Sequence, residues 1–92
     1  MAKVLVVVKV FPEDTSVNLD ELKRSIAKTL PPGYEIVRSD EEPIAFGLKA
    51  LKLYVVMEEL TEGGTSKLEE VLRQVPGVSE IEVEAVHRIS SF

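Results

Sequence analysis

Apolar residues at alternating positions predict four β-strands in this chain. The clearest run is 51–58, which predicts a central strand entered from a charged turn. Residues 4–11 are apolar on nearly both faces, which is typical of a strand in the middle of a sheet. A shorter strand is predicted over 34–39, where two adjacent apolar residues leave the register open. The last strand is predicted over 78–89, with these side chains pointing inward: Ile81, Val83 and Ala85.

Two segments with helical spacing separate these strands. The first is predicted to begin at Asn18, which forms a capping box with Glu21, and to end at a Pro-Pro-Gly run. In the second, Thr65 or Ser66 is the predicted N-cap, and Ser66 forms a capping box with Glu69. The apolar residues of both helices recur at the spacing of one buried face: Leu19, Leu22, Ile26, Leu30, Leu68, Val71, Leu72 and Val75.

The predicted order β-α-β-β-α-β defines the fold class. Two similar β-α-β halves with right-handed connections give a ferredoxin-like α+β fold, a four-stranded antiparallel sheet with both helices on one face. The first and third strands are then central, and the fourth lies at an edge. The whole chain, 1–92, is predicted to be one domain, with 89–92 as a loose tail.

Composition excludes several classes of function. The 92 residues contain no cysteine and one histidine, so disulfides, thiolate sites and thiol catalysis are excluded, and a metal site would rest mostly on carboxylates. The formal charge of −5 argues against nucleic-acid binding. Without a signal peptide or a run of about 18 apolar residues, we expect a cytoplasmic chain with no membrane association.

The candidate catalytic and ligand-binding groups each have a simpler explanation. A row of glutamates on the last strand could hold a hard cation for a metal-dependent enzyme, but a solvated outer face is the simpler explanation. The run 63–66 resembles an anion cradle without the P-loop spacing. His87, the only imidazole, lacks the partners of a catalytic triad. We therefore predict no enzyme, metal site or cofactor, and expect a protein-contact patch on the open sheet face, which carries Leu5, Val7, Tyr54 and Val56.

The segment 40–47 is predicted to be a loop of unusual composition. It places the large apolar side chains of Ile44 and Phe46 where loops are normally polar, between Pro43 and Gly47. Phe46 either folds back onto the core or contacts a partner, and its solvent exposure distinguishes these alternatives.

The segment Glu42–Lys49, which reads Glu-Pro-Ile-Ala-Phe-Gly-Leu-Lys, is followed by Leu51 and by 55–58 (Val-Val-Met-Glu). Together they resemble the signature of the translation elongation factor 1-beta family. The segments 8–13 and 83–89 fit the same family, so the resemblance covers essentially the whole chain and is to the archaeal type. It implies a guanine-nucleotide exchange factor for elongation factor 1-alpha, a GTPase with bound guanine nucleotide and Mg, that needs no cofactor of its own and is monomeric when free.

The resemblance also implies two groups of partner-binding residues. The Phe46 position resembles the residue that packs on a non-nucleotide domain of the partner, and the end of the last strand resembles the part that reaches the nucleotide site. Eukaryotic members end there in a lysine and one apolar residue, whereas here the matching pair is Arg88-Ile89 and the three residues 90–92 follow it. The partner-binding residues implied in this way are Ile44, Phe46, Gly47, Lys49, His87, Arg88 and Ile89.

These two groups are expected at opposite ends of the sheet, roughly 27 Å apart for a strand of about eight residues. A cation brought to the partner's magnesium region would compete with the metal and speed GDP release. The alternative function is a ferredoxin-like domain that senses a small ligand on its open apolar face. Metabolite binding by the purified domain, without a partner, would favour that alternative.

Overall fold

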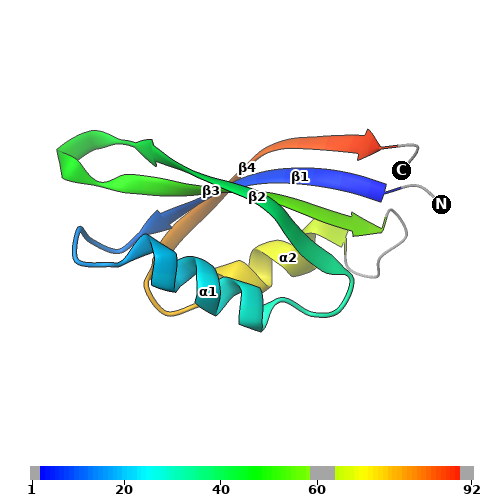
Figure 1. Cartoon of the computed structure of the whole chain (residues 1–92), viewed down its shortest axis with the longest axis horizontal. Coiled ribbons are helices and arrows are strands. Elements are labelled where there is room, and N and C mark those ends of the chain that lie inside the picture. Colours follow the sequence, from blue (N-terminus) through cyan, green and yellow to red (C-terminus); the bar gives the residue numbers. More distant parts are fainter. Residues whose placement is uncertain (1–2, 59–63, 90–92) are drawn as a thin grey trace.

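The computed structural model describes residues 3–58 and 64–89, and everything below refers to these residues. Their elements follow the predicted order: β1 (Lys3–Pro12), α1 (Leu19–Thr29), β2 (Tyr34–Pro43), a 3-10 turn (Ala45–Gly47), β3 (Lys49–Glu58), α2 (Gly64–Arg73) and β4 (Val78–Ile89). The strands form one antiparallel sheet in the order β2-β3-β1-β4, and both helices cover one of its faces (Figure 1). The ferredoxin-like α+β fold is confirmed.

The hydrophobic core lies between the sheet and the two helices. Alternate residues of the central strands β1 and β3 face the helices. The apolar stripes predicted for the two helices join this core, except for Val71, which is outside the cluster. The largest side chains that are fully buried come from both layers: Val6, Val8, Val10, Ile26, Leu53, Val55, Leu68 and Leu72. The open face of the sheet is left for other contacts.

The sequence predicted the N-cap of the first helix correctly and that of the second incorrectly. Asn18 caps α1 as expected, since its side-chain oxygen accepts a hydrogen bond of 3.0 Å from the backbone N–H of Glu21. The prediction that Thr65 or Ser66 caps α2 is wrong, because the helix begins at Gly64 and both residues lie inside its first turn. Gly64 has a φ of 51°, a conformation that glycine adopts readily.

The β2–β3 hairpin is longer than predicted. Residues 40–43, predicted as loop, continue β2, with Asp40 opposite Lys52 and Glu42 opposite Ala50. The loop therefore covers only residues 44–48. The hairpin projects beyond the ends of the helices (Figure 1). Its β2 arm is mostly acidic, whereas Ala50 and Leu51 of its β3 arm are buried.

A β-bulge interrupts each edge strand. In β2 the pairing shifts between Ile36 and Arg38, which leaves Val37 as an extra, half-exposed residue and settles the register left open by the sequence. In β4, Val83 pairs with Val8 and Ala85 with Val7. The prediction that Ala85 points inward is therefore wrong, because the extra residue before it reverses the alternation.

Candidate partner-binding site

The loop at the tip of the hairpin has a defined backbone. The N–H of Ile44 donates to the carbonyl of Leu48 at 2.8 Å, and the N–H of Leu48 donates to the carbonyl of Ala45 at 3.2 Å. Between them Phe46 has φ 60° and ψ 32°, and Gly47 has φ 76°. The left-handed region is uncommon for a residue with a side chain, and for a bulky one it indicates strain.

The ring of Phe46 faces solvent. It is 94% exposed, the highest value among the large apolar residues that the structure describes. The alternative that Phe46 folds back onto the core is therefore wrong. Ile44 is partly buried beside it, whereas Gly47 and Lys49 are exposed. A strained, exposed aromatic contributes little to the core, and this arrangement suits contact with another molecule.

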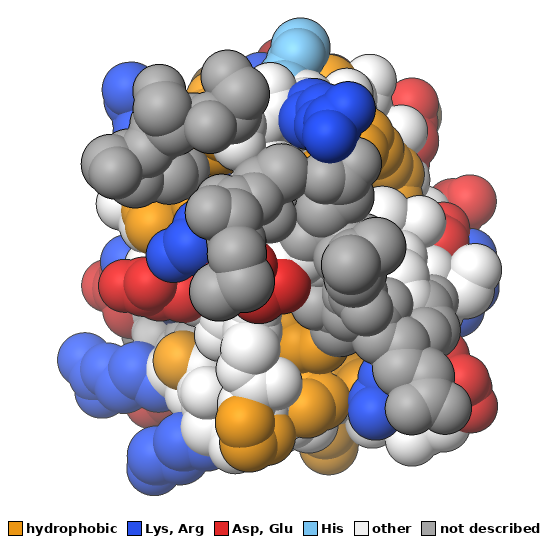
Figure 2. Space-filling model, turned by 90° about the vertical axis from the view of Figure 1, so that its right-hand side faces the viewer, with side chains coloured by type: hydrophobic (Ala, Val, Ile, Leu, Met, Phe, Trp, Pro, Cys, Tyr) orange, Lys and Arg blue, Asp and Glu red, His pale blue; other side chains and the backbone are white. Residues whose placement is uncertain are grey.

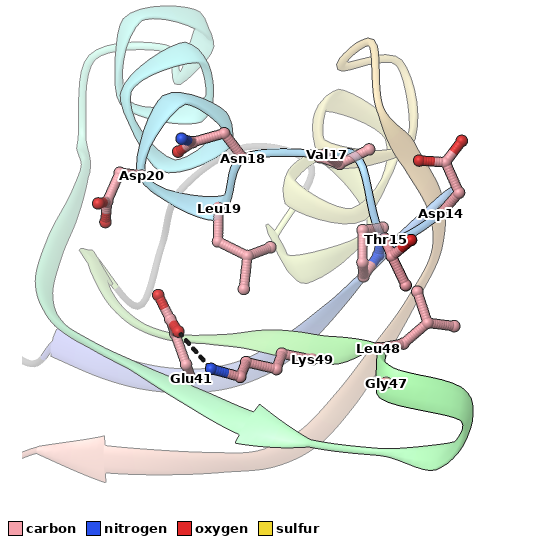
Figure 3. Close-up of a pocket in the computed structure, with 11 residues that line it drawn as sticks. Asp14, Thr15, Val17, Asn18, Leu19, Asp20, Glu41, Gly47, Leu48 and Lys49 are labelled. Atoms are coloured by element: carbon pink, nitrogen blue, oxygen red, sulfur yellow. Dashed lines mark ion pairs between the residues drawn. The ribbon is translucent and has the colours of Figure 1, made fainter.

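A groove of about 350 Å³ lies behind this loop (Figure 3). It runs between the connection from β1 to α1 and the base of the hairpin, with Leu19 and Leu48 among its apolar lining. Lys49 Nζ lies 3.8 Å from Glu41 Oε1 at its edge. In the same connection Ser16 donates to Asp14 through its hydroxyl and its backbone N–H, which lowers the pKa of the Asp14 carboxyl. The sequence did not predict the groove, because it forms only when the two segments meet.

The second predicted group lies at the other end of the sheet. His87 is opposite Leu5, Arg88 opposite Val4, and Ile89 opposite Lys3. Figure 2 views this end, where basic side chains and the imidazole gather at the upper edge. His87 and Arg88 are exposed, and Ile89 is partly buried.

The register also sets the distance between the two groups. Lys3 pairs with Glu58 at the end of β3, whereas the Phe46 loop enters β3 at Lys49. The ten residues of β3 therefore separate the two groups by roughly 30 Å. The structure thus places the predicted residues in two groups at opposite ends and brings no residue of one group near the other.

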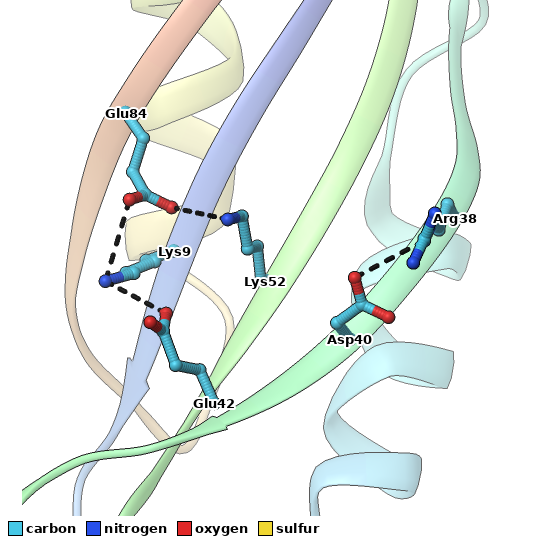
Figure 4. Close-up of polar contacts among 6 residues, drawn as sticks. All are labelled: Lys9, Arg38, Asp40, Glu42, Lys52 and Glu84. Carbon is cyan, nitrogen blue, oxygen red and sulfur yellow. Dashed lines mark ion pairs between the residues drawn. The ribbon is translucent and has the colours of Figure 1, made fainter.

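The open face differs from the expected apolar patch. Lys9 Nζ lies 2.9 Å from Glu42 Oε2 and 3.6 Å from Glu84 Oε2, and Lys52 Nζ lies 3.5 Å from Glu84 Oε1 (Figure 4). The buried Oε2 of Glu42 makes no hydrogen bond beyond this contact with Lys9. The pKa of Lys9 is raised chiefly by Glu42, and that of Lys52 chiefly by the negative charge of Glu84.

The remaining apolar residues of the open face are partly covered. Val7 and Val56 are buried, and the Tyr54 ring lies 5.5 Å from the Arg38 guanidinium and 5.9 Å from the Lys52 ammonium. Glu84, predicted to be solvated, is an exposed residue, but its side chain is 29% exposed and forms ion pairs with Lys9 and Lys52. The one signal for this network in the sequence is Lys9, a lone cation in an apolar strand.

Two further findings concern the described part of the chain. Among residues 3–58 and 64–89 there is no group of three or more His, Cys, Asp or Glu side chains that could hold a metal ion. Within the same residues no helix is long and apolar enough to cross a membrane.

Comparison with known proteins assigns the chain to a family. The profile of the EF-1 guanine nucleotide exchange domain matches residues 5–89. Over the full length of both chains, the sequence is 63% identical to elongation factor 1-beta of Hyperthermus butylicus. It is also 63% identical to that of Staphylothermus marinus, over 98% of this chain and all of the relative, and 54% identical to that of Aeropyrum pernix, over 97% and 99%. The chain belongs to the family of EF-1 guanine nucleotide exchange domains.

Solved structures support the fold alone. The C-terminal domain of a cyclometallase involved in the synthesis of the NPN cofactor of lactate racemase matches 98% of this chain and 58% of that one, with a TM-score of 0.64 and 13% identity. The C-terminal domain of the MgtC protein from Mycobacterium tuberculosis matches 99% and 88%, with a TM-score of 0.55 and 17% identity.

Proposed function

We propose that this chain is a guanine-nucleotide exchange factor that promotes GDP release, and GTP reloading, on elongation factor 1-alpha. Membership of the exchange-domain family supports the proposal, as do the full-length relatives named elongation factor 1-beta. The structural observation that carries it is Phe46, whose ring is 94% exposed on a strained loop. On this proposal the chain makes and breaks no covalent bond, needs no cofactor, and acts in the cytoplasm.

The two groups of residues would contact the partner at separate places. The apolar ring of Phe46, with Ile44, Gly47 and Lys49 around it, suits an apolar pocket on one domain. The end of β4, with His87, Arg88 and Ile89, would reach the region of the nucleotide and its magnesium. A span of roughly 30 Å requires a large partner, and a GTPase of several domains meets that requirement.

Arg88 would act through its charge. In nucleotide-bound GTPases, magnesium bridges the phosphates to the phosphate-binding loop and the switch residues. A guanidinium in this region supplies positive charge and donors of its own, so it competes for the groups that hold the metal and weakens GDP binding. By linkage, the nucleotide weakens binding of the exchange factor in return, so rebinding of GTP releases the chain.

The test is the rate at which a fluorescent GDP analogue leaves elongation factor 1-alpha, with and without this chain. Wild type is expected to accelerate release, and Phe46→Ala and Arg88→Ala are each expected to lose about tenfold or more of the acceleration. Val37→Ala removes an exposed apolar residue in the middle of β2, and Arg24→Ala removes an exposed arginine on α1, so both are matched controls that should retain it.

The outcomes separate the parts of the proposal. No acceleration by wild type with a cognate partner would contradict the exchange function itself. Acceleration that survives Arg88→Ala would keep the function and remove the role of the cation. Equal losses in Phe46→Ala and Val37→Ala would show that apolar surface in general, and not the loop, determines binding.

A further inference from the structure

β4, which carries Arg88 near its end, is interrupted twice in its pairing with β1, and the shift nearer Arg88 lies between Val7 and Val8. Val83 lies opposite Val8 and Ala85 opposite Val7, so Glu84 is the extra residue of a β-bulge. Paired residues point to the same side of a sheet, and Val7 faces the open side. Glu84 and Ala85, although consecutive, therefore both face the open side.

This bulge decides how the end of β4 is presented. Beyond it, His87 pairs with Leu5 on the open side, whereas Arg88 pairs with Val4 on the side covered by the helices. In an uninterrupted ladder continued from Val83, His87 would lie opposite Val4 and would face the helix side, while Arg88 would face the open side. A shift of the register by one residue would therefore move His87 and Arg88 each to the opposite face of the sheet.

The extra residue is held in place by charges on two other strands. The Glu84 carboxylate lies 3.6 Å from Lys9 Nζ of β1 and 3.5 Å from Lys52 Nζ of β3 (Figure 4). Its side chain is 29% exposed, and that of Lys9 is 19% exposed. Both lysines lie on the open side, so their ion pairs keep Glu84 on that side at this level of the sheet.

We propose that the pairing register of β4 beyond Glu84, in which Ala85 lies opposite Val7, positions the end of this strand: it presents Arg88 to the partner from the helix side of the sheet and His87 from the open side. This inference rests on the proposed function and deepens it. The face from which Arg88 leaves β4, in addition to its charge, determines nucleotide release.

The register itself can be tested without a partner, because the chain contains no cysteine. Residues directly opposite in antiparallel strands have Cα atoms about 4.5–5.5 Å apart, within the range for a disulfide. The double variant Leu5→Cys/His87→Cys is therefore expected to oxidise readily, and Leu5→Cys/Val86→Cys is expected to stay reduced. Preferential oxidation of the second pair would overturn the inference.

Three variants test the effect of the register on exchange. Insertion of one alanine between Val86 and His87 keeps the bulge and reverses the faces of the residues after it, so acceleration should fall about tenfold or more. The double variant His87→Arg/Arg88→His swaps the two residues and so moves the guanidinium to the open side without a change of chain length. The same loss of acceleration, about tenfold or more, is expected. Deletion of Glu84 leaves a regular ladder in which Ala85 still pairs with Val7, so acceleration should stay within about threefold.

The results distinguish this inference from the function on which it rests. If wild type does not accelerate release, the proposed function fails. If wild type is active and the exchanged variant or the insertion is equally active, the role of the register is overturned and the function stands. The Glu84 deletion variant gives a second check, once disulfide trapping has shown that Leu5 and His87 still pair in it. If this variant is as inactive as Arg88→Ala, the role of the register in exchange is also overturned.

Discussion

Phe46 and Gly47 are consecutive residues in the left-handed region of backbone conformation, at φ 60° and 76°. Glycine adopts this region without cost, whereas a residue with a side chain pays about 1–2 kcal/mol for it. The strain falls on an aromatic ring that is 94% exposed and outside the hydrophobic core. Folding alone does not account for phenylalanine at this position, and this is why stability and exchange should respond to it in opposite directions.

Phe46→Gly is expected to stabilise the fold and weaken exchange. Relief of the strain, offset by the greater freedom of glycine in the unfolded chain, should raise the free energy of unfolding by up to about 1 kcal/mol. Acceleration of GDP release should fall about tenfold, because the ring is lost. Chemical denaturation and the release assay measure the two effects. A less stable variant would contradict the assignment of strain.

Gly47→Ala is expected to disturb the same loop through its backbone. A Cβ at Gly47 would meet only Thr15 Cγ2, at 4.0 Å, so the cost of about 1 kcal/mol comes from conformation and not from a clash. Gly33→Ala is the control, since its φ of 100° also lies where residues with a side chain are disfavoured and its Cβ would have nothing within 4 Å. Both variants should lose stability, and only Gly47→Ala should raise the concentration needed for half-maximal exchange. An equal effect on exchange would remove any special role of the loop backbone.

The lysines of the open face predict a loss of stability at alkaline pH. Contact with Glu42 first, and then nearby carboxylates, raise the pKa of Lys9 above its ordinary value of 10.5. A pKa raised by folding contributes stability that is complete below the unfolded value and is lost as pH rises through the folded value. As pH rises above the ordinary value of 10.5, the free energy of unfolding should therefore fall less steeply for Lys9→Met than for wild type. Lys23→Met, which removes an exposed lysine of α1, should retain the wild-type slope.

Tyr34→Phe should destabilise the start of α2. The Tyr34 hydroxyl donates a hydrogen bond of 3.1 Å to the carbonyl of Gly64, the first residue of that helix. Loss of this bond is expected to lower the free energy of unfolding by about 1 kcal/mol and to speed exchange of the α2 amides from Leu68 onward, which bond to the carbonyls of the first turn. Tyr54→Phe, which keeps the ring on the open face, is the control. Unchanged amide exchange in α2 would contradict the proposed link.

Residue patterns predicted the order of elements, the bounds of β4, the cap at Asn18 and the opposite placement of Phe46 and Arg88. These patterns gave wrong predictions where contacts with other strands, and not the local sequence, determine the structure. Residues 40–43 were predicted as loop because they are three acidic residues and a proline, and only their pairing with residues 49–52 shows that they continue the strand. The bulge at Glu84 was missed because pairing with β1, and not the sequence of β4, determines which residue is extra.

The resemblance, and not residue patterns, assigned roles to the residues of the candidate site. Patterns alone singled out Ile44 and Phe46 as unusual and left their role open. The ion pairs of Lys9 and Lys52 with Glu84 join three strands, so their recognition requires the register of all three. The exposure and strain of Phe46 were also beyond the sequence, because they depend on the backbone of a loop only five residues long.

The two bulges also bear on self-association. β2 and β4 are the edges of the sheet, and each has an irregular residue, Val37 or Glu84, part-way along its length. A second copy that docked edge to edge would find its hydrogen-bonding groups out of step beyond that residue. The fold can therefore carry two long edge strands without offering a template for continuous sheets, the first step toward fibrils.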